Sequence, residues 1–231
     1  MNTIELYRKL LAKLGPQGWW PFDEEYHRIN NSDARFEIIV GAILTQNTAW
    51  ENVKKAIDNL KKERLLSIDG INKVKLEFLE ELIRPSGYYH QKAIRLKNLA
   101  SYLVENYNSN LDVLFEKELY DLRRELLELK GIGRETADSI LLYAGSKPIF
   151  VVDAYTMRLC NHIPLYISDS YDDVQRFFQD NLKSFFKDEE KLVDVYKELH
   201  ALIVYLGKTW CRVKPICNTC PIREDCNYYT S

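Results

Sequence analysis

Four cysteines near the C-terminus constrain this chain more than any other feature. Cys211, Cys217, Cys220 and Cys226 are separated by five, two and five residues in the stretch CRVKPICNTCPIREDC. Loops this short can bring four thiolates to one centre, and a single C-x-x-C between two longer arms suits the separated corners of an iron–sulfur cube. Two alternatives stay open: zinc, although zinc ribbons more often repeat the C-x-x-C pair, and a disulfide framework. The fifth cysteine, Cys160, is far away in sequence.

Composition limits the fold and says little about partners. With 231 residues, 46% of them hydrophobic, the chain can bury a sizeable core in one large domain or two small ones. The longest apolar run, residues 38–44, is too short to cross a membrane, and the N-terminus has no signal-peptide pattern. We therefore expect an intracellular, cytoplasmic protein. Because the net charge is −2, any nucleic-acid surface must be a local patch.

Apolar residues at helical spacing predict an all-α fold. Residues 36–44 are apolar on nearly every face, as in a fully buried central helix. The one β-like run, residues 149–152, is short, and we expect an extended connector there. Further helices are predicted where the apolar spacing is i, i+3, i+4 and i+7, within residues 53–60, 96–103, 119–129, 137–144, 174–182 and 192–203.

A short turn with two glycines, Lys130-Gly131-Ile132-Gly133-Arg134, joins two of the predicted helices. The glycines permit a tight turn with positive φ, and the apolar residue between them can plug the gap between the helices. The N–H groups that open the next helix can then face an anion, flanked by the two basic side chains. Such a hairpin can grip a DNA phosphate without reading sequence, although an ordinary helix–helix turn can have the same pattern.

The stretch LKGIGRETADSILLYAGSKPIFVVDAYTMRLC resembles the helix-hairpin-helix signature of the endonuclease III superfamily of DNA glycosylases. The C-terminal cysteines resemble the [4Fe–4S] loop of that family, residues 44–53 its early helix and turn, and residues 86–93 its intercalation loop. The similarity spans about residues 30–226. One departure is the first cysteine interval, which is one residue shorter than is usual in the family and implies a tighter loop.

The resemblance implies that Asp153 is the catalytic carboxylate. It follows the apolar pair Val151-Val152 and opens a helix, so partial desolvation raises its pKa while the helix N-terminus lowers it. A carboxylate there can stabilise the oxocarbenium character that develops when an N-glycosidic bond breaks, or it can activate water. Without the resemblance, a plain N-cap aspartate would be the better interpretation.

Family members that also cut the DNA backbone use a lysine just after the hairpin as a Schiff-base nucleophile. At the matching position, with its separation from Asp153 preserved, this sequence has Glu135. Because a carboxylate cannot form an imine, the sequence predicts a monofunctional glycosylase that uses water. Glu135 is also compatible with a simple first-turn acid favoured by the helix dipole.

Tryptophans suggest a pocket for a flat, cationic base such as an alkylated purine, although core filling explains them equally well. The motifs WWP, LTQNTAW and HALIVYLGK resemble most the 3-methyladenine DNA glycosylase branch of the endonuclease III type. In that branch, residues matching Trp19 and Trp50 sandwich the base, and those matching Trp20 and Pro21 complete the wall. A lysine matching Lys208 lies near the pocket, where it can be carbamylated, but Lys208 could equally contact a phosphate.

The resemblance also implies a DNA interface. Gln46 matches a residue that fills the hole left by the extruded nucleotide, and Tyr88 and Tyr89 occupy the loop that wedges into the base stack. Interface tyrosines that pack on the following helix are the alternative. We expect Lys92, together with the hairpin, to contact phosphates, and we assign no histidine as a metal ligand because the four histidines lack metal-like spacing.

These inferences predict an all-α protein of two helical lobes. A six-helix lobe with the hairpin is expected over residues 33–145, and a second lobe with the [4Fe–4S] loop over residues 1–32 and 146–231. The predicted activity is that of a monomeric, monofunctional base-excision glycosylase acting on double-stranded DNA that contains a damaged base such as 3-methyladenine. One alternative is a mismatch glycosylase for thymine or uracil opposite guanine, or for adenine opposite 8-oxoguanine. The other is a non-catalytic iron–sulfur DNA-binding protein.

Overall fold

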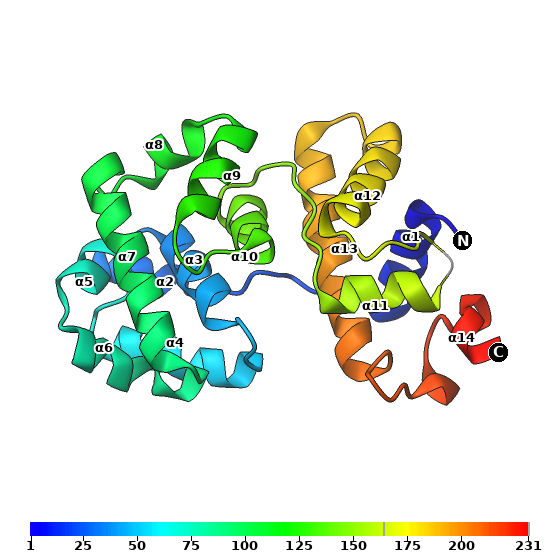
Figure 1. The fold of residues 1–231 in the computed structure, drawn as a ribbon, viewed down its shortest axis with the longest axis horizontal. Coiled ribbons are helices and arrows are strands. Elements are labelled where there is room, and N and C mark those ends of the chain that lie inside the picture. Colours follow the sequence, from blue (N-terminus) through cyan, green and yellow to red (C-terminus); the bar gives the residue numbers. More distant parts are fainter. Residues whose placement is uncertain (164, 231) are drawn as a thin grey trace. The chain divides into compact units, whose positions relative to one another are not determined.

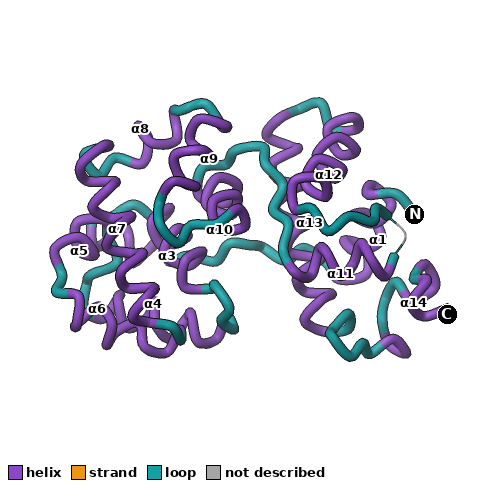
Figure 2. The backbone as a smooth tube through the Cα atoms, viewed as in Figure 1, coloured by secondary structure: helices purple, strands orange, loops and turns teal. Residues whose placement is uncertain are grey.

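The computed structural model describes residues 1–163 and 165–230, and the chain divides into two compact units. We call Trp20–Gly145 the hairpin unit, and Met1–Trp19 with Ser146–Ser231 the cysteine unit. All regular structure in the described residues is helical (Figure 1), and no strand is drawn in Figure 2, so the predicted all-α fold class is confirmed. None of the described helices is both long and apolar enough to cross a membrane.

The hairpin unit is built around α3 (Ala34–Leu44), in which every residue from Phe36 to Leu44 is buried. Asp33 caps this helix by accepting a hydrogen bond from the Arg35 N–H at 2.9 Å. The prediction of a fully buried central helix is therefore confirmed. Around α3 pack α4 (Trp50–Lys62), α7 (Tyr89–Tyr107) and a π-helical turn, η2 (Ile140–Ala144). The other elements are α2 (Glu24–Asn30), α5 (Ile68–Lys73), α6 (Leu76–Ile83), η1 (Arg84–Ser86), α8 (Leu111–Glu116), α9 (Leu119–Glu128) and α10 (Arg134–Ser139).

Residues 20–32 group with the hairpin unit, although the sequence analysis assigns them to the other lobe. A buried ion pair explains this grouping, because His27 Nε2 lies 2.9 Å from Glu37 Oε2 in α3. The other ring nitrogen of His27 contacts Ser32 Oγ at 2.7 Å, and Lys61 Nζ reaches the second oxygen of Glu37 at 2.7 Å. Short helices such as α5 and α8 bring the unit above the six helices expected.

The cysteine unit is organised around its longest helix, α13 (Glu189–Thr209), against which α1 (Thr3–Leu14) and α11 (Ala154–His162) pack. Gly207 permits the close approach of α11, because a Cβ at this position would collide with the ring of Tyr155. The other elements of this unit are α12 (Tyr171–Phe185), which packs on α1, and the short η3 (Cys217–Thr219), η4 (Arg223–Asp225) and α14 (Asn227–Thr230).

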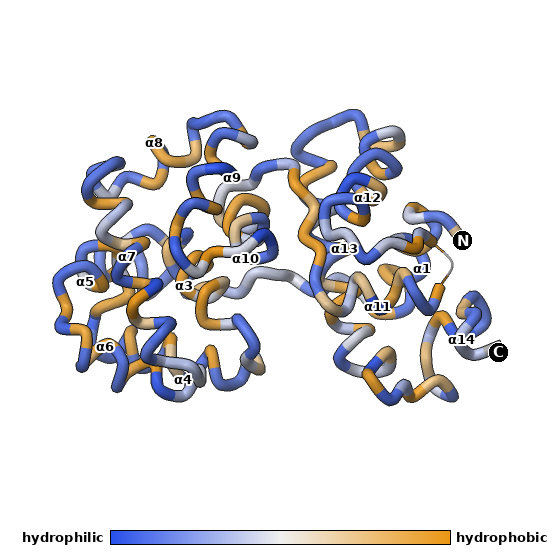
Figure 3. Tube along the Cα trace, viewed as in Figure 1, coloured by the Kyte–Doolittle hydropathy of each residue, from blue (hydrophilic) through white to orange (hydrophobic). Residues whose placement is uncertain are grey.

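Residues 149–152 form the extended connector that the sequence predicts, and all four are buried. The segment belongs to the cysteine unit, leads into α11 and is orange in the hydropathy colouring of Figure 3. Phe150 stacks on Phe178 of α12 with ring centroids 4.6 Å apart, and its N–H donates to the side chain of Gln179 at 2.9 Å. This anchoring fixes the place at which the next residue, Asp153, opens α11.

Candidate functional site

Asp153 is the N-cap of α11, and one of its carboxylate oxygens is fully engaged by the first turn. Oδ1 accepts hydrogen bonds from the Thr156 N–H at 2.7 Å and from the Thr156 hydroxyl at 2.9 Å. The side chain is only 9% exposed. The N-cap role that the sequence left open is thus real, but it uses only one of the two oxygens.

The second oxygen of Asp153 faces a histidine that the sequence analysis did not assign to the site. His200 Nε2 lies 3.7 Å from Oδ2, and the His200 side chain is 6% exposed. Burial raises the pKa of Asp153, but the interaction with His200 and the two bonds from Thr156 outweigh it, so the pKa falls below its ordinary value of 3.8. The available signal was a histidine inside the apolar stripe of α13, between Leu199 and Ile203.

Trp19 and Lys208 continue this group within the cysteine unit. The Trp19 ring meets the His200 ring edge to face, with centroids 6.1 Å apart and planes at 78°. Lys208 Nζ lies 5.6 Å from the centroid of the same tryptophan ring, which places an ammonium on an indole face. The structure therefore brings together three residues that the sequence singled out: His200 lies between Asp153 and Trp19, and Lys208 lies on the Trp19 ring.

The remaining residues expected in the base pocket belong to the hairpin unit. The Trp20 ring meets Trp50 at 5.6 Å and 85° and Tyr143 at 5.2 Å and 63°, so the three rings form an edge-to-face aromatic cluster. Trp20 also lies directly over Gly41, where a Cβ would be 2.9 Å from its indole nitrogen. Pro21, beside it, is exposed. The sequence analysis missed Tyr143, since its stretch reads simply as an apolar helix.

The glycine hairpin between α9 and α10 has the predicted turn. Gly131 has φ +91°, which favours glycine, and Ile132 is buried between the helices. Arg123 of α9 and the fully buried Asp138 of α10 form a bidentate ion pair at 2.7 and 3.0 Å, which fixes the two helices against each other. The residues predicted to face DNA or the lyase position are all exposed: Lys130, Gly131, Gly133, Arg134 and Glu135.

The Gln46 side chain is hydrogen-bonded to this hairpin. Its amide nitrogen donates to the Gly131 carbonyl at 3.1 Å and to the Thr136 hydroxyl at 2.9 Å. Its amide oxygen accepts a hydrogen bond from Arg95, whose side chain also lies against Gly131. A role for Gln46 in filling the space of an extruded nucleotide stays a prediction, and it would require breaking these contacts.

The loop before α7 distinguishes two tyrosines that the sequence treats alike. Tyr88 is 68% exposed, whereas Tyr89 is half-buried and lies against the His90 ring at 4.2 Å. Lys92 differs from expectation. Its side chain is buried and its ammonium is bonded to three protein oxygens, so the predicted phosphate contact is wrong for this arrangement.

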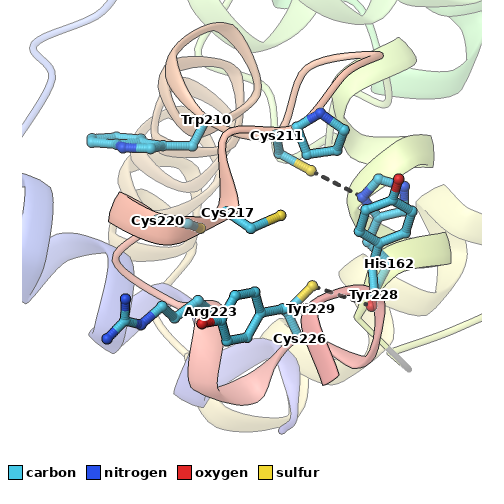
Figure 4. Close-up of a pocket in the computed structure, with 10 residues that line it drawn as sticks. His162, Trp210, Cys211, Cys217, Cys220, Arg223, Cys226, Tyr228 and Tyr229 are labelled. Atoms are coloured by element: carbon cyan, nitrogen blue, oxygen red, sulfur yellow. Dashed lines mark hydrogen bonds between the residues drawn. The ribbon is translucent and has the colours of Figure 1, made fainter. Parts of the chain in front are cut away.

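The four C-terminal cysteines line one hollow, and the side chains of Cys211, Cys217 and Cys226 point toward it in Figure 4. Within residues 1–163 and 165–230, no group of three or more His, Cys, Asp or Glu could hold a single metal ion. Tetrahedral zinc requires such a group, whereas the thiolates of a cube bind iron atoms at separate corners. Four thiols are the donor type that an iron–sulfur cluster takes, and a cluster at this site stays a proposal. Cys160 is buried elsewhere.

His162, at the end of α11, contacts two of these cysteines. Its Nδ1 lies 3.2 Å from Cys211 Sγ, and its backbone carbonyl accepts from Cys226 Sγ at 3.5 Å. Tyr228 stacks on the imidazole with centroids 4.4 Å apart. Burial raises the pKa of the Cys211 thiol to about 11, with the neighbouring cysteines acting in the same direction and Arg158 opposing it.

Comparisons with known proteins agree on a family. The model of HhH-GPD superfamily base excision DNA repair proteins matches residues 40–184. The chain is 45% identical, over 96% of its length and 94% of the relative, to a Methanocaldococcus jannaschii protein provisionally named a DNA repair glycosylase. It is 28% identical to an endonuclease III of Thermotoga maritima, over 84% of this chain and 83% of that protein.

Solved structures support the same assignment. The H. pylori 3-methyladenine DNA glycosylase bound to 1,N6-ethenoadenine superposes with a TM-score of 0.72 at 29% identity, covering 90% of this chain and 98% of that one. A thermostable thymine-DNA glycosylase shares the fold with a TM-score of 0.71 at 19% identity, covering 98% and 96%. The resemblance inferred from the sequence is thereby confirmed, and the chain belongs to the HhH-GPD superfamily of base excision DNA repair glycosylases.

Proposed function

We propose that this protein is a monofunctional DNA glycosylase that removes alkylated purines, such as 3-methyladenine, from double-stranded DNA. The observation that carries the proposal is the state of Asp153. Its carboxylate is almost buried, its pKa is lowered, and one of its oxygens has no hydrogen bond from the first turn of α11. An ionised, partly unsatisfied carboxylate is suited to stabilise a developing sugar cation.

The chemistry follows from that carboxylate. As the N-glycosidic bond lengthens, positive charge develops on the sugar, and Oδ2 of Asp153 is the oxygen available to face it. Thr156 holds Oδ1, which fixes the orientation of the group without consuming its charge. The electrons of the broken bond leave with the base, and water adds to the sugar cation. Asp153 can accept the proton of that water through the same oxygen.

Glu135 supports the monofunctional assignment. It lies in the first turn of α10 and is exposed, at the position where lyase-active relatives of the family have a lysine. An imine with the opened sugar requires an amine, which a carboxylate does not provide. The enzyme should therefore release a DNA strand that contains an abasic site but is not cut.

The rings of Trp19 and Trp50 are the proposed aromatic contacts of the damaged base. In the cysteine unit, Trp19 lies beside the His200–Asp153 pair, and in the hairpin unit Trp50 belongs to the cluster of Trp20 and Tyr143. Aromatic faces attract cations, and an alkylated purine carries positive charge and is already a good leaving group. The 29% identity to the H. pylori 3-methyladenine glycosylase supports this branch over the mismatch alternative.

DNA is proposed to bind along the exposed face of the hairpin. The turn residues Lys130 and Arg134 are exposed beside backbone N–H groups that open α10, and a phosphate can be held there without sequence readout. Exposed Tyr88 is proposed to enter the base stack.

The cysteine hollow is proposed to hold a [4Fe–4S] cluster through Cys211, Cys217, Cys220 and Cys226. The bound cluster would supply folding energy to the C-terminal turns, which otherwise consist of short 3₁₀ segments. The purified protein should be yellow-brown, with about four irons per chain. Stoichiometric zinc without visible absorbance would overturn this proposal, and Cys160→Ser should leave the iron content unchanged.

The activity is tested with a panel of duplexes that carry single lesions. We expect release of 3-methyladenine as a free base, little release of uracil or thymine from mismatches or of adenine opposite 8-oxoguanine, and strand breaks only after alkali or heat. Treatment with borohydride should trap no covalent adduct. Preference for a mismatched base would refute the alkylated purine as the substrate and favour a mismatch glycosylase. A trapped adduct would refute the monofunctional chemistry. Release of no base would indicate a DNA-binding protein without glycosylase activity.

A further inference from the structure

A fully buried ammonium ties two distant segments of the hairpin unit together. Lys92 of α7 is 1% exposed. Its Nζ donates to the Leu44 carbonyl at 2.8 Å, the Thr48 hydroxyl at 2.7 Å and the Ser86 carbonyl at 2.7 Å. All three donors of the ammonium are used, and the Leu44 carbonyl is one of those that have no partner inside α3 because the helix ends there.

Thr48 completes the connection. Its hydroxyl accepts the bond from Lys92 and donates its own proton to the Ser86 carbonyl. The Ser86 carbonyl therefore receives two bonds, immediately before the turn at Gly87, which has φ +63°. We call Lys92, Thr48 and the Ser86 carbonyl the loop knot. It fastens residues 84–88 to the turn that follows α3.

The residue just beyond the knot is in an unfavourable backbone conformation. Tyr88 has φ +46° and ψ +30°, in the left-handed region, where a bulky side chain is an outlier. Such conformations persist only where the surroundings determine them, and they concentrate at functional sites. Tyr88 immediately precedes α7 and is 68% exposed, so the conformation is not explained by burial of the ring.

We propose that the loop knot is a positioning device of the DNA interface, which holds Tyr88 in its strained conformation so that this ring, and not that of Tyr89, enters the base stack. The inference rests on the proposed DNA-binding function and assigns a role to two residues, Lys92 and Thr48, that do not themselves contact DNA. The Tyr89 ring is half-buried, lies against His90 and is near Arg84, so it packs on neighbouring side chains of the protein.

Geometry favours this role over a phosphate contact or simple filling of the core. An ammonium that contacts phosphate must be exposed, and that of Lys92 is not. An apolar side chain would fill the same space without the desolvation of a charge, which is unfavourable unless the charge is fully bonded. The bonds of Lys92 end on Leu44 and Thr48, at and after the end of α3, and on Ser86, two residues before the exposed tyrosine.

The experiment compares Thr48→Val with Thr48→Ser. Valine keeps the shape of threonine and removes the hydroxyl, while serine keeps the hydroxyl. Each variant is titrated onto a duplex in which 2-aminopurine lies beside a stable abasic-site analogue, so that fluorescence reports unstacking. We expect Thr48→Val to lower the equilibrium constant for unstacking about tenfold, the effect of one buried hydrogen bond, and Thr48→Ser to restore it.

A double-mutant cycle separates positioning from general damage. Tyr88→Ala should abolish most of the fluorescence rise, and adding Thr48→Val to Tyr88→Ala should cause no further loss. Tyr89→Ala should leave the larger part of the signal. If Thr48→Val reduces unstacking as strongly without Tyr88 as with it, or leaves unstacking unchanged in a folded protein, the proposal is wrong.

Two safeguards keep the result decisive. Thermal unfolding is measured for every variant, and if Thr48→Val does not fold, Lys92→Met is tested in the same cycle with Tyr88→Ala. Since the duplex contains no excisable lesion, the readout does not depend on the base that the enzyme releases. A wild-type protein that unstacks this duplex but releases no base from the panel of lesion duplexes would refute the proposed glycosylase activity and leave the loop knot standing. A wild-type protein that unstacks nothing would refute the loop knot.

Discussion

Lys92 in the hairpin unit and Asp153 in the cysteine unit are both buried charges, but their partners differ. Each of the three protons of Lys92 is bonded at 2.7–2.8 Å. Asp153 has two bonds on Oδ1, while Oδ2 has only His200 Nε2 at 3.7 Å among the described residues, which is longer than a hydrogen bond. A saturated charge can only hold structure, whereas a charge with an unsatisfied oxygen can still interact with a substrate.

The strongest test of this contrast is Asp153→Asn. Asparagine is as good an N-cap as aspartate, so the bonds to Thr156 and the fold should be retained. Single-turnover excision should fall about 10²–10³-fold, because one electrostatic stabiliser of the sugar cation is lost. Thermal unfolding should change little. Near-normal excision by this variant would show that Asp153 is structural, like Lys92.

Lys92→Met should have the opposite profile. Methionine fills the volume, but it leaves the Leu44 carbonyl and the Thr48 hydroxyl without the donor they share and removes one of the two donors of the Ser86 carbonyl. The free energy of unfolding should therefore fall by about 2–4 kcal/mol. Urea unfolding measures this, and Lys54→Met on the exposed side of α4 is the control, with an expected change within about 0.5 kcal/mol. A Lys92→Met protein as stable as wild type would mean that the ammonium is not needed for the loop.

The sequence predicted the helices with long apolar stripes, because a buried face repeats at every turn. Residues 36–44 and 192–203 are examples. It could not show that residues 20–32 join the hairpin unit, since that depends on tertiary contacts such as the buried pair of His27 and Glu37 and the packing of Trp20 on Trp50, which no periodicity reveals.

Motif spacing identified the cysteines and Asp153 as candidate site residues, but it could not distinguish exposed from buried side chains. Lys92 therefore looked like a phosphate contact, and Tyr88 looked equivalent to Tyr89. His200 was missed for a related reason. A single histidine in an apolar stripe has no spacing signal, and only the packing of α11 on α13 places it beside Asp153.

The pH dependence of excision sharpens the comparison further. The pKa of Asp153 is lowered, so the carboxylate stays ionised until the pH falls below 3.8, the ordinary pKa of an aspartate side chain. Its contribution to stability is present above the unfolded-state pKa and is lost as the pH falls through the lower, folded-state pKa. Burial lowers the pKa of Lys92 to about 8, with Arg95 adding to the effect, so this group stays mainly protonated at neutral pH. Single-turnover excision should therefore show no acid limb between about pH 5 and 7.

The smallest expected effect concerns His200, which lowers the pKa of Asp153 and touches Trp19. His200→Phe keeps a ring against Trp19 but removes the nitrogen that faces Oδ2, while His200→Gln can retain a donor. In the phenylalanine variant the burial of Asp153 is less opposed, so the pKa of Asp153 should rise and the acid limb should move to higher pH. Excision at pH 7 should change only a few-fold, through kcat, and glutamine should reverse most of the shift. An unmoved acid limb in His200→Phe, with a changed KM alone, would mean that His200 serves only to pack Trp19, and that Thr156 alone holds Asp153 ionised.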